Sequence, residues 1–529
     1  VMKPLVKDFP GYLADATGRI VMETSSYGGT GICGLEVLNA TGEQVLAINC
    51  GGPAVGNFKS ECQEQITNSF PVDRPGSMTI DARGDLWIVQ RGNDFPIGIT
   101  TSAKYKAAIR CYTTAGKFTG REITDVINPR GLGYDAAQDR LLVADNGPDQ
   151  QVRIYSGLSK VPLLVSTLGE RGGVFSGVTP GLINNPATGS RFAGLAGVGV
   201  DVSGHIYVGG GFQGTDLRQI NANGTSGWML NSLMFCATYD VDPDSDGRDI
   251  YGTYNHLRLD LAQTAPGSEQ NYRSYNWDLN RFGLPVRPDK SQAVLRRLGT
   301  NRQLVMYTTG QGLIENINIY RYQGEIAIPA GGTRDNGKIL WIDTNEDGIE
   351  DPAERTVMAP ELRCIAHVCV EPNGDLWITD ATSGSFVRHF PLNGLSPKGV
   401  PLYRGTADGY TDERFPEEGD KTSAWGMSSR FEYDAVRDIA IACYPVVGRT
   451  GDHDRSPKQY AMARYDHWKT GNRTPTWKNK VFTPESHPEH FMYERDLYPY
   501  SNYMGTQLVG DYVFSAYLFG EIHVFDLKT

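Results

Sequence analysis

A dense run of oxygen ligands occupies residues 343–354. Acid or amide side chains stand at positions 1, 3, 5, 9 and 12 of this stretch, and Gly348 at position 6 permits a sharp turn. This is the spacing of an EF-hand calcium loop, because Ca²⁺ takes about six to eight hard oxygen ligands. The predicted ligands of this EF-hand-like calcium loop are Asp343, Asn345, Asp347, the backbone carbonyl of Ile349, Asp351 and Glu354.

The loop follows a predicted strand over residues 338–342 and has no strong flanking helix pair. We therefore expect the Ca²⁺ to be structural, with a solvated acidic turn as the alternative. A second acidic stretch begins at Asp242 and continues through Asp244, Asp246 and Asp249, but Thr253 stands where the acid of position 12 belongs. The sequence leaves open whether this incomplete copy holds a metal.

The richest polar row follows that second stretch. Side chains alternate in direction along a strand, so Tyr254, His256 and Arg258 are expected to share one face. They would offer a base, His256 or Tyr254, and a cation, Arg258, to one substrate. Arg171, at the start of a glycine-rich excursion, is a second candidate cation. The alternative is a set of ordinary strand residues with a structural ion pair between Arg258 and Asp260.

Charge and hydropathy exclude two classes of partner. The 529 residues include 50 lysines and arginines against 61 aspartates and glutamates, a net charge of −11. A duplex-binding protein needs a basic surface, so we expect no nucleic-acid partner. No apolar run approaches the roughly 18 residues that span a bilayer, so we expect no membrane span. Residues 1–30 lack an apolar stretch, and any signal peptide is expected to have been removed or never to have existed.

Cysteines and glycosylation sequons indicate the compartment. Three sequons in turn-like settings begin at Asn39, Asn223 and Asn472. Among the eight cysteines, the pairs close enough in sequence for a local disulfide are Cys50–Cys62 and Cys364–Cys369. We predict a secreted glycoprotein, and the alternative is a cytosolic enzyme with free thiols.

The elements that must position these residues come from a repeat. A turn built on an acid and a glycine, followed by a strand of aliphatic and aromatic residues, recurs at 81–89, 201–209 and 371–380. A second strand–turn–strand phrase is expected over 34–48, 108–123, 151–165, 217–230 and 386–403. Each unit predicts a four-stranded antiparallel meander. Nine units are expected, starting near residues 12, 78, 132, 198, 237, 302, 365, 427 and 504.

One meander cannot bury both of its faces, whereas a ring of meanders stacked about an axis can. The predicted fold class is all-β, a β-propeller of seven or eight four-stranded blades, so some of the nine units must share a blade. We expect the N- and C-terminal strands, residues 1–9 and 503–527, to close the ring. Residues 1–529 are then expected to form a single domain.

The repeat phrase, followed by Val152-Arg153-Ile154-Tyr155 or Val387-Arg388-His389-Phe390, resembles the NHL-repeat and SMP-30-like β-propellers. The resemblance covers nearly the whole chain. It implies architecture more than activity, because this superfamily includes lactonases, peptide-amidating lyases, carbohydrate-active enzymes and binding modules. The axial metal site of the lactonases and the histidine-bound zinc of the amidating lyases cannot be assembled from these residues.

Together these observations favour a secreted carbohydrate-active β-propeller. As an enzyme it would be a polysaccharide lyase: Arg258 or Arg171 would neutralise a uronic acid carboxylate while His256 or Tyr254 removed the C5 proton. The 27 tyrosines and 8 tryptophans are consistent with sugar-stacking surfaces. A non-catalytic propeller that binds a glycan or a protein is the alternative, and a metal-dependent hydrolase or lactonase is a further one.

Overall fold

The structure of the protein is a computed structural model. It describes four strands within residues 12–49, given below, and then residues 72, 75–92, 106–185, 189–210, 216–231, 239–263, 270–282, 291–310, 316–335, 337–358, 365–380, 386–405, 413–414, 430–445, 460–471, 474–482, 503–517 and 522–528. The chain divides into two compact units, Val1–Met234 with Arg273–Leu284 (unit 1) and Phe235–Tyr272 with Pro285–Thr529 (unit 2). Each unit is described by itself, and the single-domain expectation stays a prediction.

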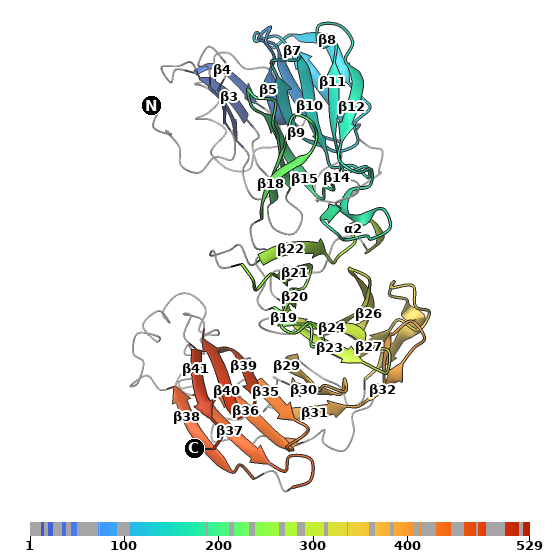
Figure 1. The fold of residues 1–529 in the computed structure, drawn as a ribbon, viewed down its shortest axis with the longest axis vertical. Coiled ribbons are helices and arrows are strands. Elements are labelled where there is room, and N and C mark those ends of the chain that lie inside the picture. Colours follow the sequence, from blue (N-terminus) through green and yellow to red (C-terminus); the bar gives the residue numbers. More distant parts are fainter. Residues whose placement is uncertain are drawn as a thin grey trace. The chain divides into compact units, whose positions relative to one another are not determined.

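Unit 1 contains four four-stranded antiparallel sheets in its described residues, each following chain order (Figure 1). Their strands are β1 (Tyr12–Ala14), β2 (Ile20–Thr24), β3 (Gly34–Leu38) and β4 (Gln44–Asn49); β5 (Pro75–Ile80), β6 (Leu86–Gln90), β7 (Ala108–Tyr112) and β8 (Phe118–Ile123); β9 (Pro129–Asp135), β10 (Arg140–Asp145), β11 (Gln151–Ser156) and β12 (Leu163–Leu168); and β15 (Leu195–Val200), β16 (Ile206–Gly210), β17 (Asp216–Ile220) and β18 (Ser226–Asn231). The smaller elements are the 3₁₀ turn η1 (Gly173–Phe175), the hairpin of β13 (Asn184–Asn185) and β14 (Gly189–Ser190), and helix α2 (Leu279–Phe282).

Unit 2 has larger variation in sheet size. Its sheets, in chain order, are formed by β19 (Asp240–Val241), β20 (Asp249–Tyr251), β21 (Asn255–Leu259) and β22 (Gln270–Tyr275), within which the chain returns to unit 1; β23 (Ser291–Leu298), β24 (Gln303–Gly310), β25 (Asn318–Gln323), β26 (Ile326–Arg334), β27 (Ile339–Ile342) and β28 (Arg355–Val357); β29 (Ile365–Val370), β30 (Leu376–Asp380), β31 (Phe386–Phe390) and β34 (Glu413–Arg414); β35 (Arg430–Asp434), β36 (Ile439–Pro445), β37 (Tyr460–Asp466) and β38 (Trp477–Phe482); and β39 (Tyr503–Val509), β40 (Tyr512–Tyr517) and β41 (Ile522–Asp526). The 3₁₀ turn η3 (Pro352–Glu354) precedes β28, and β32 (Leu392–Leu395) pairs with β33 (Pro401–Tyr403).

The first strands of several consecutive sheets lie beside one another within each unit, as blades of a propeller do. In unit 1, β9 contacts both β5 and β15, and in unit 2, β35 contacts both β29 and β39. Glycine permits the close approach of β9 and β15, since a Cβ at Gly131 would stand 2.6 Å from Gly197 Cα. The meanders and their contacts support a β-propeller fold, while the blade count and the closure of a ring stay predictions.

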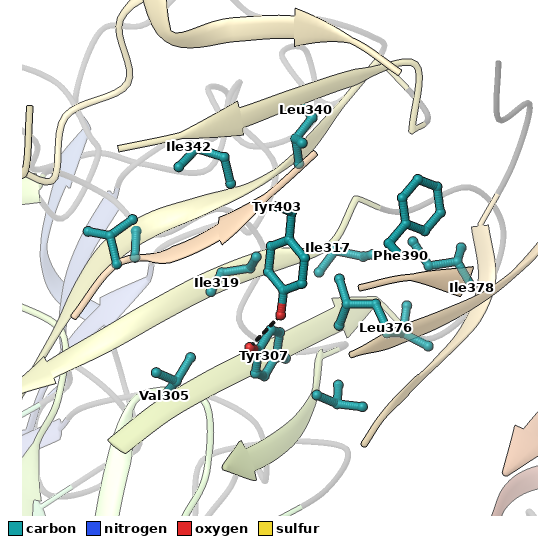
Figure 2. Close-up of a cluster of buried hydrophobic side chains, with 14 of the residues drawn as sticks. Val305, Tyr307, Ile317, Ile319, Leu340, Ile342, Leu376, Ile378, Phe390 and Tyr403 are labelled. Atoms are coloured by element: carbon teal, nitrogen blue, oxygen red, sulfur yellow. Dashed lines mark hydrogen bonds between the residues drawn. The ribbon is translucent and has the colours of Figure 1, made fainter. Parts of the chain in front are cut away.

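Apolar side chains of neighbouring sheets form the cores. In unit 2, the largest cluster joins the sheet of β23–β28 to that of β29–β31, and Figure 2 shows its centre around Tyr307, Leu376 and Tyr403. The Tyr307 and Tyr403 hydroxyls are hydrogen-bonded at 2.7 Å. This core leaves a cavity of ≈ 10 Å³, room for about one water molecule. It is a packed core and not a substrate pocket.

Each of the nine predicted units coincides with one sheet of three or more strands. Two details differ from the prediction. The start expected near 302 falls at β24, and the turn between β23 and β24, residues 299–302, carries no acid. The phrase expected over 386–403 is not one hairpin: β31 pairs with β34, and β32–β33 form a separate hairpin. Tyr403 on β33 instead donates a hydrogen bond to the Gly374 carbonyl at 2.6 Å, which holds this hairpin against the turn of residues 371–375.

Several predictions about compartment and closure concern residues outside the described ranges, including residues 1–9, Cys50, Cys62, Cys364, Asn39 and Asn472. Cys369 carries a free, buried thiol, so its expected disulfide with Cys364 is not observed. The Asn223 sequon lies exposed in the turn between β17 and β18. Within the described ranges, no helix has the length and apolar character that a membrane crossing requires.

Candidate functional site

The predicted calcium loop joins β27 to β28 in unit 2. Asp343 directly follows β27 and is fully buried. Its Oδ1 accepts a hydrogen bond from the backbone N–H of Asp347 and its Oδ2 one from Gly348, each at 3.1 Å. Gly348 has a φ of 79°, a left-handed conformation that favours glycine. The loop therefore curls around the carboxylate at its first position.

The last predicted ligand of the loop reaches back to its start. Glu354 Oε1 accepts hydrogen bonds from the Asn345 N–H and the Thr344 hydroxyl, each at 3.0 Å, and Oε2 accepts one from Trp341 Nε1 at 2.9 Å. Burial raises the pKa of Asp343, and the neighbouring Glu354 adds to that effect. The loop thus gathers carboxylates around a buried one, an arrangement that a cation would stabilise.

The incomplete acidic copy is neutralised by arginines. Arg297 donates to both carboxylate oxygens of Asp242, through Nε at 2.9 Å and through Nη2. Arg302 does the same for Asp244, with Nε at 3.0 Å. These guanidinium groups already compensate the charge that a metal would meet, so the structure supports a salt-bridged turn at this stretch.

His256 is 3% exposed, and both of its ring nitrogens face carboxylates. Nδ1 lies 2.9 Å from Glu325 Oε2, and Nε2 lies 2.9 Å from Asp249 Oδ1. The ring also stacks on Tyr251, with centroids 4.0 Å apart. Both ring nitrogens are therefore already bound to side chains of the protein, within a buried site.

The other predicted catalytic residues lie in different surroundings. Arg258 is exposed, and its Nη1 lies 3.8 Å from Asp249, the same carboxylate that binds His256. Tyr254 is 2% exposed. Arg171 belongs to unit 1, where its exposed side chain pairs with Asp149 at 3.0 Å. The catalytic assignment of these four residues stays a prediction.

A cluster that the sequence analysis missed lies at the turn between β29 and β30. Glu371 and Asp375 stand at the two ends of this turn, and His389 lies on β31, where it pairs in register with Trp377. His389 Nε2 is 3.6 Å from Glu371 Oε1 and 3.4 Å from Asp375 Oδ2. Their candidate ligand atoms all lie within 4.8 Å of one another, so these side chains could hold a metal ion.

Neighbouring groups orient the two carboxylates. Glu371 Oε1 accepts hydrogen bonds from Trp377 Nε1 at 2.7 Å and from Lys469 Nζ at 3.1 Å. Asp375 Oδ1 accepts the backbone N–H of Leu392 at 2.8 Å. Burial disfavours the charged form of Asp375, but His389 and the Leu392 N–H outweigh it and lower the pKa of that carboxyl to about 2. Burial also disfavours the charged form of Glu371, but His389, Trp377 and Lys469 outweigh it and lower the pKa of that carboxyl, so both acids are ionised near neutral pH.

A comparison of the repeat copies with one another would have found His389. In the sheet of β29–β31, His389 pairs in register with Trp377, the second residue of the second strand. In four other sheets the residue at the same register position is Cys111, Tyr155, Gln219 or Tyr465. Histidine stands at this position in one of these five copies. The phrase Val387-Arg388-His389-Phe390 served only to mark the repeat, and the contact with Glu371 and Asp375 depends on strand register that the sequence does not state.

No family model matches the chain, and no curated protein matches it. Among solved structures, it is similar to a gluconolactonase from Xanthomonas campestris, with 15% identity over 46% of this chain and 67% of that one and a TM-score of 0.25. It is also similar to the extracellular domain of a hybrid two-component system from B. thetaiotaomicron, with 12% identity over 98% of this chain and 58% of that one and a TM-score of 0.28. A third similar structure is the dihydro-heme d1 dehydrogenase NirN, with 12% identity over 75% of this chain and 76% of that one and a TM-score of 0.23. Likenesses of this strength do not bear on what the chain binds or catalyses.

Proposed function

We propose that this protein is a calcium-stabilised repeat protein of the propeller class, with Ca²⁺ held in the loop of residues 343–354. The buried carboxylate of Asp343 at the centre of that loop is the observation that supports it. Burial removes water from this carboxylate and disfavours its charged form, and a bound cation compensates for that loss. The ligands would be Asp343, Asn345, Asp347, the carbonyl of Ile349, Asp351 and Glu354.

The loop suits calcium because its donors are all oxygens and its backbone is already curled. Hydrogen bonds link the predicted ligand positions directly: Asn345 Oδ1 accepts the Asp347 N–H at 3.0 Å, and Asn345 Nδ2 lies 3.5 Å from Asp351 Oδ2. A hard cation with flexible geometry fits such a set of carboxylate and amide oxygens. The ion would tie together the outer strands β27 and β28, which frame the loop.

Terbium luminescence tests this proposal directly. Tb³⁺ replaces Ca²⁺ at oxygen sites, and Trp341 is hydrogen-bonded to the proposed ligand Glu354, so it can sensitise a bound Tb³⁺. We expect luminescence that added Ca²⁺ quenches and that Glu354→Gln abolishes. Removal of Ca²⁺ from a loop saturated 100-fold over Kd should cost about 2.7 kcal/mol and lower the Tm by about 5 °C.

The second acidic turn provides the matched control. Asp244→Asn changes a carboxylate that Arg302 already neutralises, so it should leave the terbium signal and its competition by Ca²⁺ unchanged. A chelator-treated protein with an unchanged Tm and no sensitised luminescence would contradict calcium binding in this loop.

We also propose that the protein acts outside the cell and holds a carbohydrate without cleaving it. The exposed Asn223 sequon is compatible with this location. The engagement of both His256 nitrogens by carboxylates argues against this residue as the base of a β-elimination. A glycan array should show binding, while incubation with polyuronates should produce no ultraviolet absorbance from an unsaturated sugar. The appearance of that absorbance would contradict this proposal and support a polysaccharide lyase activity.

A further inference from the structure

We infer that Glu371, Asp375 and His389 form a binding site for a divalent transition-metal ion of the Zn²⁺ type. The acids flank the β29–β30 turn, and the histidine reaches them from β31. Two carboxylates and one imidazole are a ligand set that zinc and its neighbours accept. This site differs from the calcium loop, which offers oxygen ligands alone, and the two can be tested separately.

The separations between the candidate ligand atoms agree with those around a metal ion. His389 Nε2 lies 3.6 Å from Glu371 Oε1 and 3.4 Å from Asp375 Oδ2. Around a tetrahedral ion with bonds of about 2.1 Å, neighbouring ligand atoms lie about 3.4 Å apart. The two distances therefore match the edges of a coordination polyhedron.

A second histidine of unit 2, among the described residues, also lies between two carboxylates and shows the contrast. His256 uses opposite ring nitrogens for Glu325 and Asp249, both at 2.9 Å, which is the geometry of two separate hydrogen bonds. In His389 a single nitrogen faces both carboxylates. One N–H cannot point fully at two oxygens, but one lone pair can point at an ion held between them.

The scaffold fixes the turn before any ion binds. Arg296 Nε donates to the backbone carbonyl of Glu371 at 3.2 Å. Tyr403 donates to the carbonyl of Gly374 at 2.6 Å, and its hydroxyl is tied to that of Tyr307 in the core shown in Figure 2. Both contacts hold the backbone of the turn in place.

The side chains of the two acids are held as well, by Trp377 Nε1 on Glu371 and by the Leu392 N–H on Asp375. Such outer hydrogen bonds orient metal ligands in known sites. Because backbone and carboxylates are both fixed, little reorganisation is needed for binding.

Lys469 now supplies a positive charge at this position. Its ammonium group lies 3.1 Å from Glu371 Oε1, while Glu371 itself is almost completely buried. The lysine side chain is 27% exposed, so it has a path to solvent and can give way to an ion. Lysine and metal therefore compete for the same carboxylate, and removal of the lysine should strengthen metal binding.

Cobalt titration tests the inference. The full-length protein is stripped with a chelator, resupplied with Ca²⁺ and titrated with Co²⁺, whose visible absorption reports nitrogen and oxygen ligation. We expect one Co²⁺ per chain, displaced by Zn²⁺, and at least about tenfold weaker binding in His389→Gln. Glutamine is a matched replacement, because Gln219 occupies the equivalent register position in another copy. Lys469→Met should bind Co²⁺ more tightly than the parent.

Two further variants make the outcome decisive. Glu354→Gln should lose the calcium loop and leave Co²⁺ binding unchanged, so failure of the calcium proposal and failure of this one are distinguishable. Asp375→Asn should weaken Co²⁺ binding even if His389→Gln does not fold. Equal Co²⁺ affinity in the parent, His389→Gln and Asp375→Asn would overturn the site, and so would an absence of Co²⁺ binding in both the parent and Lys469→Met.

Discussion

Two copies of the same turn, one in each unit, show how the repeat varies. Residues 81–85 and 371–375 are each closed by a backbone hydrogen bond from the first residue to the carbonyl of the fifth, at 3.0 and 2.8 Å. Each is followed by a fully buried tryptophan, Trp87 or Trp377, whose indole N–H donates to the first acid at 3.1 or 2.7 Å. The acid pair and the tryptophan therefore belong to the architecture.

The copies differ in what compensates the acids. In unit 1, Arg83 bonds Asp81 at 2.7 Å, and Arg121 pairs with Asp85. The third strand there presents Cys111, whose pKa burial raises to about 11, so the thiol is neutral near pH 7. The two carboxylates of the unit 1 turn are thus neutralised by two arginines, Arg83 and Arg121.

In unit 2, Glu371 and Asp375 meet one lysine, Lys469, and an imidazole, His389. With a neutral histidine, the two carboxylates of this turn face one positive charge, whereas those of the unit 1 turn face two. A structural acid pair thus becomes a candidate ion site where a sheet lacks one of the compensating arginines and has a metal-ligating side chain, His389, in its place.

The largest expected difference comes from removing the indole donors. Trp377→Phe and Trp87→Phe each delete one N–H and a similar volume from a fully buried site. Asp81 keeps the Arg83 bond to the same oxygen, at 2.7 Å, whereas Glu371 Oε1 keeps the bond from the flexible Lys469 side chain, at 3.1 Å. A hydrogen bond to a charged group is worth about 1.5–3 kcal/mol, so we expect losses of about 3 kcal/mol for Trp377→Phe and about 2 for Trp87→Phe in urea unfolding. Equal losses would show that the two turns are energetically alike.

Much of this comparison could be predicted from the sequence and part of it could not. The acid–glycine–aromatic sequence pattern predicts both turns, because turn-forming residues and the alternation of side chains along a strand are local features of the sequence. The contact of His389 with Glu371 and Asp375 is set by the register between β30 and β31, which single-sequence reasoning does not determine. The burial of His256 between Asp249 and Glu325 was missed for the same reason, since Glu325 lies in a different sheet.

The next prediction concerns the thiol that stands in the place of His389. With a pKa of about 11, Cys111 has a thiolate fraction at pH 8 that is smaller than that of an ordinary cysteine by about 100-fold or more. Iodoacetamide should therefore alkylate Cys111 in the native protein at least about 100-fold more slowly than in urea-unfolded protein. Peptide mass spectrometry measures the two rates. Rapid native labelling would mean that the sheet around Cys111 opens locally, and it would contradict the buried, neutral thiol.

The smallest expected effect comes from the pair of Arg83 with Asp139. Unit 2 has Asn373 in the place of this arginine. Arg83 reaches beyond Asp81 to Asp139, at 3.1 Å. That contact, helped by the Tyr134 hydroxyl and opposed by burial, holds the pKa of Asp139 below its usual range. A lowered carboxyl pKa contributes stability that is present above the ordinary aspartate value and is lost as the pH falls through the lowered one.

Because the Asp139 side chain is about half exposed, solvent screening keeps the Asp139 share of the loss in Arg83→Met below about 1 kcal/mol at pH 7. The lost bond to the buried Asp81 carboxylate adds to the total, while Asp81 keeps the Trp87 donor in this variant. The difference from the parent should shrink as the pH falls below about 4, because protonated aspartates no longer gain from the arginine. Arg171→Met provides the control, since it removes an exposed pair with Asp149 in the same unit and should change stability little at either pH. Urea unfolding of all three proteins at neutral and acidic pH measures this. A loss in Arg83→Met that is the same at both pH values would place the role of Arg83 in packing rather than in charge, and would weaken the argument that arginine compensation separates the two turns.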